Sequence, residues 1–422
     1  MKELQIFKGD IIFTPTPQEF VSLEGGYIVV SNGKVEGLYE ELPETFKGVE
    51  ITDFGRRLII PAFVDLHVHA PQYYQTGVGM DKELIPWLNS HTFPLERRFD
   101  DPEFAREAYS SFVDELIRQG TLRACIYATV HKESTEILFD ILASRGIGAF
   151  VGKINTDRNC PHYLKEDTSL SLHETEELII SYNDHPMVKP IVTPRFAPTS
   201  TEKLLNGLAQ LARKYNVPVQ SHLSENTQEI EWVKELFPSQ ATYADVYYYF
   251  GLLGQTPTLM AHAIHLEERE LELIENSNVW LVHCPESNIN LSSGIMPVRE
   301  LLDRGTKLGL GSDIGAGHNI ALYRVMVRAI QLSKIRCFFE PNVKPLSSPE
   351  AFYLGTKGGG SFFGKVGSFE KGFSFDAIVV DDKLPETLEF SLEDRLQKFL
   401  YTGESDSIIA RFLEGKRINC GD

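Results

Sequence analysis

The sequence predicts an α/β protein, a (β/α)8 barrel with a small β-sandwich domain formed from both chain ends. Through the middle of the chain, short apolar segments alternate with longer amphipathic segments, the pattern of repeated βα units. The two ends instead alternate single apolar and polar residues, as antiparallel strands do. We therefore expect a barrel over residues 61–365 and a small composite β domain over residues 1–60 together with 366–422.

The first evidence for the β domain is the alternation of apolar and polar residues over 25–42, GGYIVVSNGKVEGLYEEL. Asn32-Gly33 lies between two strand-like runs there, which predicts a β-hairpin. Near the other end of the chain, FSFDAIVVDD (373–382) and RINC (417–420) are predicted as short strands. Because both ends show the same alternation of apolar and polar residues, we expect them to share one β domain.

Eight strands are expected in the barrel, the number that closes this fold. They cover residues 58–69, 121–130, 147–154, 188–196, 217–222, 257–262, 278–284 and 306–313. Amphipathic segments such as 101–120, 201–216 and 267–277 separate them, and Asp101-Pro102 and Thr201 are typical helix starts.

The composition of the chain excludes some classes of binding partner. The net charge of −18 argues against a nucleic-acid partner, because binding a polyanion requires clustered Lys and Arg. No apolar run approaches the roughly 20 residues of a membrane span, and no signal peptide is evident. The five cysteines show no C-x-x-C spacing, which is typical of a reducing compartment. We expect a cytoplasmic protein with a small-molecule partner and no membrane attachment.

Polar residues stand at the ends of several predicted strands. His67 and His69 end the first strand, and His222, His262 and Asp313 end later ones. In a (β/α)8 barrel the carboxyl ends of all strands meet at one face, where active sites lie. Residues distant in the sequence are therefore expected to converge.

A metal site is the chemistry that this set favours. His67 and His69 are two residues apart on a strand, so their side chains point to the same side. With His222 and Asp313 they supply imidazole and carboxylate ligands suited to Zn²⁺ or Fe²⁺. Glu225 follows His222 closely enough to act as a proton shuttle, although a carboxylate there could simply begin the next helix.

Six motifs carry a family resemblance. PAFVDLHVHAPQY, VTPRFAPT, QSHLSEN, LMAHAIHL, VHCPESNINLSSG and GLGSDIGAG resemble the successive motifs of the guanine deaminases, within the amidohydrolase superfamily. The resemblance runs through the whole chain and includes GSFEKGFSFDAIVVDD, where these proteins return to the small β domain.

The resemblance implies roles for particular residues. His67, His69, His222 and Asp313 would bind one Zn²⁺ per chain, with Fe²⁺ as the alternative. Glu225 would be the general acid and base, and His262 would hydrogen-bond the attacking oxygen. The implied catalytic residues are thus Glu225, His262 and Asp313, and the implied substrate-binding residues are Gln72, Arg195 and Phe196.

Two further features bear on this assignment. Two-metal relatives carry a carboxylated lysine near the end of the fourth strand, where this chain has Arg195 and Phe196, so one metal is expected. For Phe196, packing in the core is the alternative to contact with a substrate ring. Trp87 is expected to pack in a loop over the pocket, and His283 to form part of the loop or the pocket wall.

The reaction implied is hydrolytic deamination of guanine to xanthine and ammonia, by a protein that the resemblance indicates is a homodimer. One alternative is a related amidohydrolase that deaminates another purine, a pterin or a triazine ring. A second is a non-catalytic scaffold that retains the barrel, but such a protein would be expected to lose ligands, and all four stand in this sequence.

Overall fold

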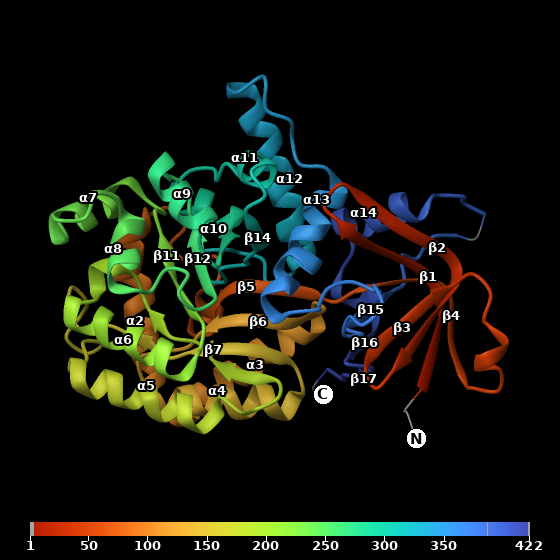
Figure 1. Ribbon diagram of the computed structural model, residues 1–422, viewed down its shortest axis with the longest axis horizontal. Coiled ribbons are helices and arrows are strands. Elements are labelled where there is room, and N and C mark those ends of the chain that lie inside the picture. Colours follow the sequence, from red (N-terminus) through yellow and green to blue (C-terminus); the bar gives the residue numbers. More distant parts are fainter. Residues whose placement is uncertain (1–3, 386, 421–422) are drawn as a thin grey trace.

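A barrel of parallel strands surrounded by helices forms the larger part of the molecule (Figure 1). The structure, a computed structural model, describes residues 4–385 and 387–420. The eight strands of the barrel are β5 (Phe63–His69), β6 (Thr121–Tyr127), β7 (Gly148–Gly152), β9 (Val188–Pro190), β11 (Val219–Leu223), β12 (Thr258–His262), β13 (Val279–His283) and β14 (Lys307–Leu310).

The strands pair in two four-stranded parallel sheets, β5-β6-β7-β9 and β11-β12-β13-β14. A parallel bridge between Val192 and Val219 joins the two sheets after β9. At the other seam, the backbone N–H of Asp313 donates to the His67 carbonyl over 2.8 Å. The short strands β8 (Ile154–Asn155) and β10 (Thr193–Pro194) extend the wall. The predicted barrel is confirmed, but its first predicted strand, 58–69, is divided, because residues 58–61 belong to β4 (Ile51–Pro61) of a second sheet and only β5 lies in the barrel.

Helices cover the outside of the barrel, and two of them begin where the sequence predicts. Asp101 caps α3 (Pro102–Arg118) by accepting from the Glu103 N–H, and Thr201 caps α6 (Glu202–Tyr215) by accepting from the Leu204 N–H. The other outer helices are α4 (Lys132–Arg145), α5 (Thr168–Tyr182), α8 (Tyr243–Phe250), α9 (Glu268–Glu275), α11 (Val298–Asp303), α12 (Leu322–Phe339) and α13 (Ser348–Tyr353). Among the described residues, no helix is both long enough and apolar enough to span a bilayer.

Both chain ends contribute to one seven-stranded sheet, in the order β17-β16-β15-β4-β1-β2-β3. Its strands are β1 (Leu4–Thr16), β2 (Glu19–Ser31), β3 (Lys34–Tyr39), β4 (Ile51–Pro61), β15 (Ala377–Val380), β16 (Ile408–Leu413) and β17 (Lys416–Arg417). Asn32 and Gly33 form the predicted hairpin between β2 and β3. The expectation of purely antiparallel pairing is wrong for β4, which lies parallel to β1 because residues 40–50 cross back to the far side of β1.

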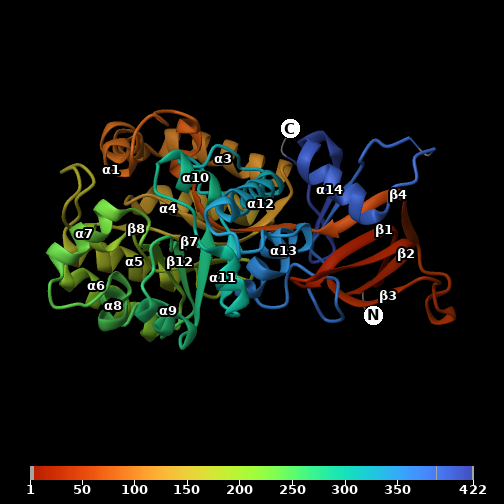
Figure 2. The same ribbon diagram turned by 90° about the horizontal axis from the view of Figure 1, so that it is seen from above.

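The two faces of this sheet pack against different parts of the molecule. Side chains alternate between the faces of a strand. Along β4, Leu58 and Ile60 accordingly join the large core that includes the barrel helices, and Ile59 joins a separate core with Phe7 and Phe375. The sheet therefore lies directly against the barrel, beside α13 and α14 (Leu392–Thr402), as Figure 2 shows from above.

Candidate active site

The predicted metal ligands converge at the carboxyl ends of the barrel strands. Asp313 Oδ1 lies 3.2 Å from His67 Nε2 and 3.4 Å from His69 Nε2. His69 Nε2 is in turn 3.2 Å from His222 Nε2. These nitrogen and oxygen atoms come from β5, β11 and the loop after β14, so the barrel brings together residues that are up to 246 positions apart in the sequence.

An irregularity in β5 helps to turn both histidines to this site. The pairing of β5 with β6 shifts its register between Asp65 and Val68. Asp65 is fully buried, and its Oδ1 accepts from the backbone N–H groups of His67 and Ser312, each over 3.1 Å. Burial raises the pKa of Asp65 to about 6. Asp65, which sequence reasoning missed, thus ties the strand of His67 to the loop of Asp313.

Second partners orient two of the imidazoles. His222 Nδ1 lies 2.6 Å from the carbonyl oxygen of Arg195, and His262 Nδ1 lies 2.9 Å from Asn288 Oδ1. Because a carbonyl oxygen only accepts, the Nδ1 atom of each ring carries a proton, and Nε2 faces the site. Asn288 was not predicted, although it stands in the HCPESN motif.

The side chains at the site suit a divalent metal ion. Burial lowers the pKa of His67 and holds those of His69 and His222 well below the usual value, so these rings are neutral. Burial alone would raise the pKa of Asp313, but its hydrogen bond and electrostatic interactions with His67 and the neighbouring histidines hold the pKa well below its usual value, so the carboxyl group is ionised. Within the described residues, the buried Nε2 atoms of His67 and His262 form no hydrogen bond. Neutral imidazoles beside a carboxylate are the donors that zinc and iron prefer.

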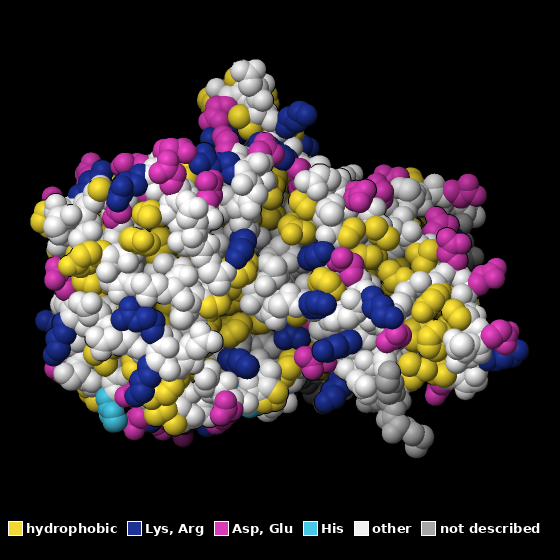
Figure 3. All heavy atoms as spheres, in the orientation of Figure 1, with side chains coloured by type: hydrophobic (Ala, Val, Ile, Leu, Met, Phe, Trp, Pro, Cys, Tyr) yellow, Lys and Arg dark blue, Asp and Glu magenta, His cyan; other side chains and the backbone are white. Residues whose placement is uncertain are grey.

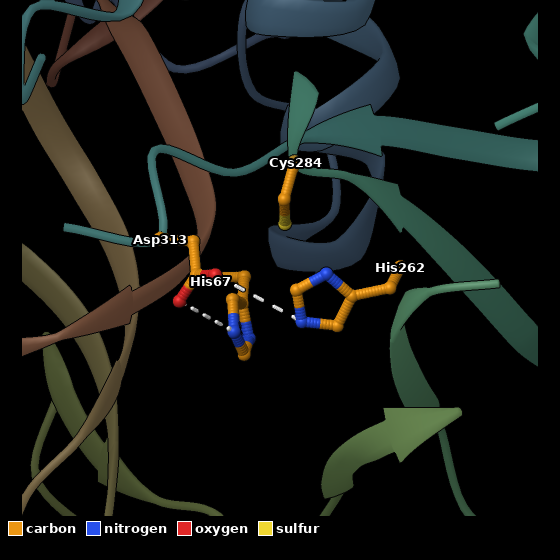
Figure 4. Close-up of side chains that lie close together, drawn as sticks. All are labelled: His67, His262, Cys284 and Asp313. Carbon is orange, nitrogen blue, oxygen red and sulfur yellow. Dashed lines mark ion pairs between the residues drawn. The ribbon is translucent and has the colours of Figure 1, made fainter. Parts of the chain in front are cut away.

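A second grouping of possible ligands overlaps the first. His67, His262, Cys284 and Asp313 also offer ligand atoms within 4.8 Å of one another (Figure 4). Burial raises the pKa of the Cys284 thiol well above its usual value, whereas the thiolate is the form that binds metal. The grouping of His67, His69 and His222 with Asp313 is therefore better suited to hold the ion.

Glu225 lies beside this cluster. Its side chain is only 4% exposed, and its Oε2 is 3.5 Å from His262 Nε2. Asn226, not Glu225, caps the following helix α7 (Thr227–Leu236), so the helix-start explanation of Glu225 is wrong. Burial and the nearby charge of Asp313 raise the pKa of Glu225 well above its usual value. A carboxyl group that holds its proton more tightly than usual therefore faces the cluster and is placed to transfer a proton.

A pocket opens from this cluster toward the loop after β5. The polar residues that sequence reasoning assigned to the substrate, Gln72 and Arg195, line it together with Phe196. Trp87 lines the pocket and also donates from Nε1 to the Val78 carbonyl over 2.9 Å, so it both packs the loop and covers the pocket. The remaining lining residues are His69, Leu84, Leu88, His222, Glu225, His262, Leu291, Asp313 and Ala316.

Two other residues differ from the sequence expectations. His283 is buried at the end of β13 but is not among the residues that line this pocket. Glu96, which sequence reasoning did not single out, is buried behind the pocket, where it contacts both Arg195 and Gln72. Nothing in the local sequence marks Glu96, because its partners are 99 and 24 residues away.

Comparison with known proteins places the chain in a family. The amidohydrolase family matches residues 58–418. Guanine deaminase of Dictyostelium discoideum is 38% identical, over 99% of this chain and 98% of the relative, and the human guanine deaminase is 38% identical over 88% and 86%. The crystal structure of guanine deaminase from C. acetobutylicum with guanine bound in its active site superposes with a TM-score of 0.97, at 49% identity, covering 99% of this chain and all of that one. This chain therefore belongs to the amidohydrolase family.

Proposed function

We propose that this protein is a guanine deaminase, which hydrolyses the C2–N bond of guanine to give xanthine and ammonia. The observation that carries this proposal is the juxtaposition, on one barrel face, of the imidazole and carboxylate cluster with Glu225 and the pocket of Gln72, Arg195 and Phe196. The relatives support the same activity, since guanine deaminases match nearly the whole chain.

His67, His69, His222 and Asp313 hold the ion that this metal-dependent family requires. We assign one Zn²⁺ per chain, with Fe²⁺ as the alternative, because His and carboxylate ligands suit both ions. When bound, such an ion supplies Lewis-acid activation of a water molecule near neutral pH.

Glu225 moves the protons. Burial raises its affinity for a proton, and in its protonated form it gives that proton to ring N3 as water attacks C2 of guanine. The carboxylate so formed takes one proton of the water and passes it to the departing amino nitrogen. The second proton of the water returns Glu225 to its protonated state as the carbonyl of xanthine forms and ammonia leaves.

His262 and Asp313 orient the attacking oxygen. Since the His262 Nδ1 proton is engaged by Asn288, its Nε2 accepts a hydrogen bond, and it faces both Glu225 Oε2 at 3.5 Å and Asp313 Oδ2 at 3.9 Å. Asp313 stays ionised and also accepts. Two acceptors at this position hold the water with its lone pair directed to the ring carbon.

Arg195, Gln72 and Phe196 bind the base. The Arg195 guanidinium has donors and no acceptor, so it suits the oxo group of guanine. Phe196 is 5% exposed and lines the pocket 6.5 Å from the His222 ring, between centroids, which supports ring contact over core packing alone.

We also propose a cytoplasmic homodimer with the domain division given above, 1–60 with 366–422 and 61–365. All five cysteines are free thiols, which supports a reducing compartment. At the end of α12, Phe338 and Phe339 are 82% and 80% exposed. The end of α12 stands out from the body of the molecule (Figure 1), and Figure 3 shows the surface of a projection on the same side. Exposed aromatic side chains of this size support a protein contact at that projection.

The activity is tested by incubating the purified protein with guanine, adenine or a triazine and measuring ammonia and the ring product. Release of ammonia from guanine, with xanthine formed in equal amount and little reaction of the other two, is expected. Turnover of adenine or the triazine in preference to guanine would keep the hydrolase but contradict the assigned substrate.

A further inference from the structure

Glu96 contacts two of the residues that the proposed function assigns to base recognition. It ends α2 (Phe93–Glu96), in the loop region after β5, and only 2% of its side chain is exposed. Its Oε2 accepts from Arg195 Nη1 over 2.7 Å, and its Oε1 accepts from Gln72 Nε2 over 3.2 Å. Because Glu96 is not among the lining residues of the pocket, it acts on a ligand through these two side chains.

Arg195 is held on two sides by the same short helix. Besides the bond to Glu96, its Cζ lies 5.2 Å from the ring centroid of Phe93, one helical turn earlier. An arginine side chain has many rotamers, and fixing it before the ligand arrives reduces the entropy that binding must overcome. The remaining guanidinium N–H groups are thereby directed before binding.

Glu96 also determines which way the Gln72 amide faces. A carboxylate only accepts hydrogen bonds, so the Gln72 atom beside it must be the amide nitrogen. The Gln72 oxygen therefore faces away from Glu96, toward Gly315. A Cβ atom at Gly315, whose φ is +112°, would lie 2.5 Å from that oxygen, so only glycine leaves room for it.

We propose that Glu96 is a positioning residue that sets the substrate specificity of the pocket, an inference that rests on the proposed function. It fixes the position of the Arg195 donors and, by accepting from the Gln72 amide nitrogen, leaves the Gln72 oxygen as the acceptor. Guanine matches this pair, because its C6 oxo group accepts and the neighbouring N1–H donates. A 2,6-diaminopurine reverses both positions, with an amino donor at C6 and a bare N1 acceptor, and is rejected although it carries the same amino group at C2.

The test compares guanine with 2,6-diaminopurine in the wild type and in Glu96→Gln. The amide of the variant can donate to Gln72 as well as accept, and it carries no charge for Arg195, so neither partner is fixed. We expect kcat/KM for guanine to fall at least about 10-fold, mainly through KM, and the preference for guanine over 2,6-diaminopurine to shrink at least about 10-fold.

Asp376→Asn is the matched control. Asp376 pairs with the buried Arg123 over the same 2.7 Å, but at the junction with the seven-stranded sheet and away from the pocket. It should reduce stability and leave the preference between the two purines unchanged. A parallel loss of preference in this control would show that Glu96→Gln acts through general destabilisation, and would overturn the inference.

Glu96→Asp provides the second variant, since it keeps the charge that Arg195 needs but is one methylene too short to reach both partners. We expect it to fold and to lose part of the preference for guanine. An unchanged preference in both folded variants overturns the inference, and so does loss of the fold in both, because Glu96 would then be a structural residue. The proposed function fails separately, if the wild type itself releases no ammonia from guanine.

Discussion

The barrel face and the seven-stranded sheet both bury ionisable side chains, but these side chains differ in how fully they are hydrogen-bonded within the protein. Beside the sheet, Arg395 of α14 donates to Asp10 of β1 over 2.5 Å and to Asp382 over 2.6 Å, and Asp10 also accepts from the Gly25 N–H. At the barrel face, the buried His67 Nε2 and His262 Nε2 form no hydrogen bond within the described residues.

The difference in hydrogen bonding distinguishes groups that stabilise the fold from groups that are free to bind a ligand. A buried polar atom without a hydrogen bond costs free energy, so two such atoms close together at the barrel face indicate a place for a ligand. Backbone conformation points the same way, because His262 and Asp313 both have a positive φ, at 73° and 47°. Such strain in residues other than glycine is typical of functional sites.

Substitution at the barrel face should affect chemistry far more than stability. In Glu225→Gln the side chain keeps its size but loses the transferable proton, so we expect kcat to fall by about 10³-fold or more. Ammonia release from guanine measures this, with metal content and the unfolding temperature as controls. A kcat within 10-fold of wild type, in a protein that still holds metal, would show that Glu225 is not the proton shuttle.

Substitution of Arg395, on α14 beside the sheet, should reduce stability and leave the catalytic activity almost unchanged. Arg395→Met leaves Asp10 and Asp382 buried without their cation, and breaking a buried pair costs about 3–5 kcal/mol of unfolding free energy. Denaturant unfolding measures this loss, and kcat/KM for guanine should stay within about 2-fold of wild type at 25 °C. Lys383→Met, which removes an exposed ion pair with Asp406, is the control and should leave stability unchanged.

If Arg395→Met reduced turnover without reducing stability, the division between the two regions would be wrong. Such a result would mean that the buried charges of the sheet act on the pocket through the barrel.

The smallest expected effect is a pH-dependent change in stability caused by Glu229, a buried residue that contacts the backbone of Glu225. Its carboxylate accepts from the Glu225 N–H over 3.0 Å and from the Tyr243 hydroxyl over 2.8 Å. Burial raises the pKa of Glu229 from 4.5 to about 7. Since the folded state holds this proton more tightly, the contribution of Glu229 to stability is present below pH 4.5 and is lost as the pH rises through 7.

Glu229→Gln removes that titration. The destabilisation caused by this substitution should therefore be smaller at pH 8 than at pH 5, by at most about 3 kcal/mol. Denaturant unfolding at the two pH values measures the difference. An equal effect of the substitution at both values would mean that the carboxyl group titrates alike in the folded and unfolded protein.

Much of the candidate site could be predicted because its residues stand at strand ends. A strand end is visible in the sequence, and the barrel topology then implies that His67, His222 and Asp313 meet. Sequence reasoning missed three residues that do not stand at a predicted strand end: Asp65, Glu96 and Asn288. Their partners are remote in sequence, 247 residues away in the case of Asp65 and Ser312, so only the folded chain shows them.

The parallel pairing of β4 with β1 could not be predicted for a similar reason. Alternation of apolar and polar residues predicts strands near the chain ends, but it does not give the direction in which a strand such as β4 runs beside its neighbour. That direction depends on the path of residues 40–50, which carry no periodic pattern.

The most direct test of the whole account is the metal content of the purified protein, determined on the sample whose guanine turnover is measured. We expect about one zinc or iron ion per chain, loss of turnover when a chelator removes it, and recovery when either ion is returned. Asp313→Ala should bind no stoichiometric metal. Full turnover by metal-free protein, or a wild type that binds no metal at all, would contradict the assignment of the barrel face as a metal-dependent deaminase site.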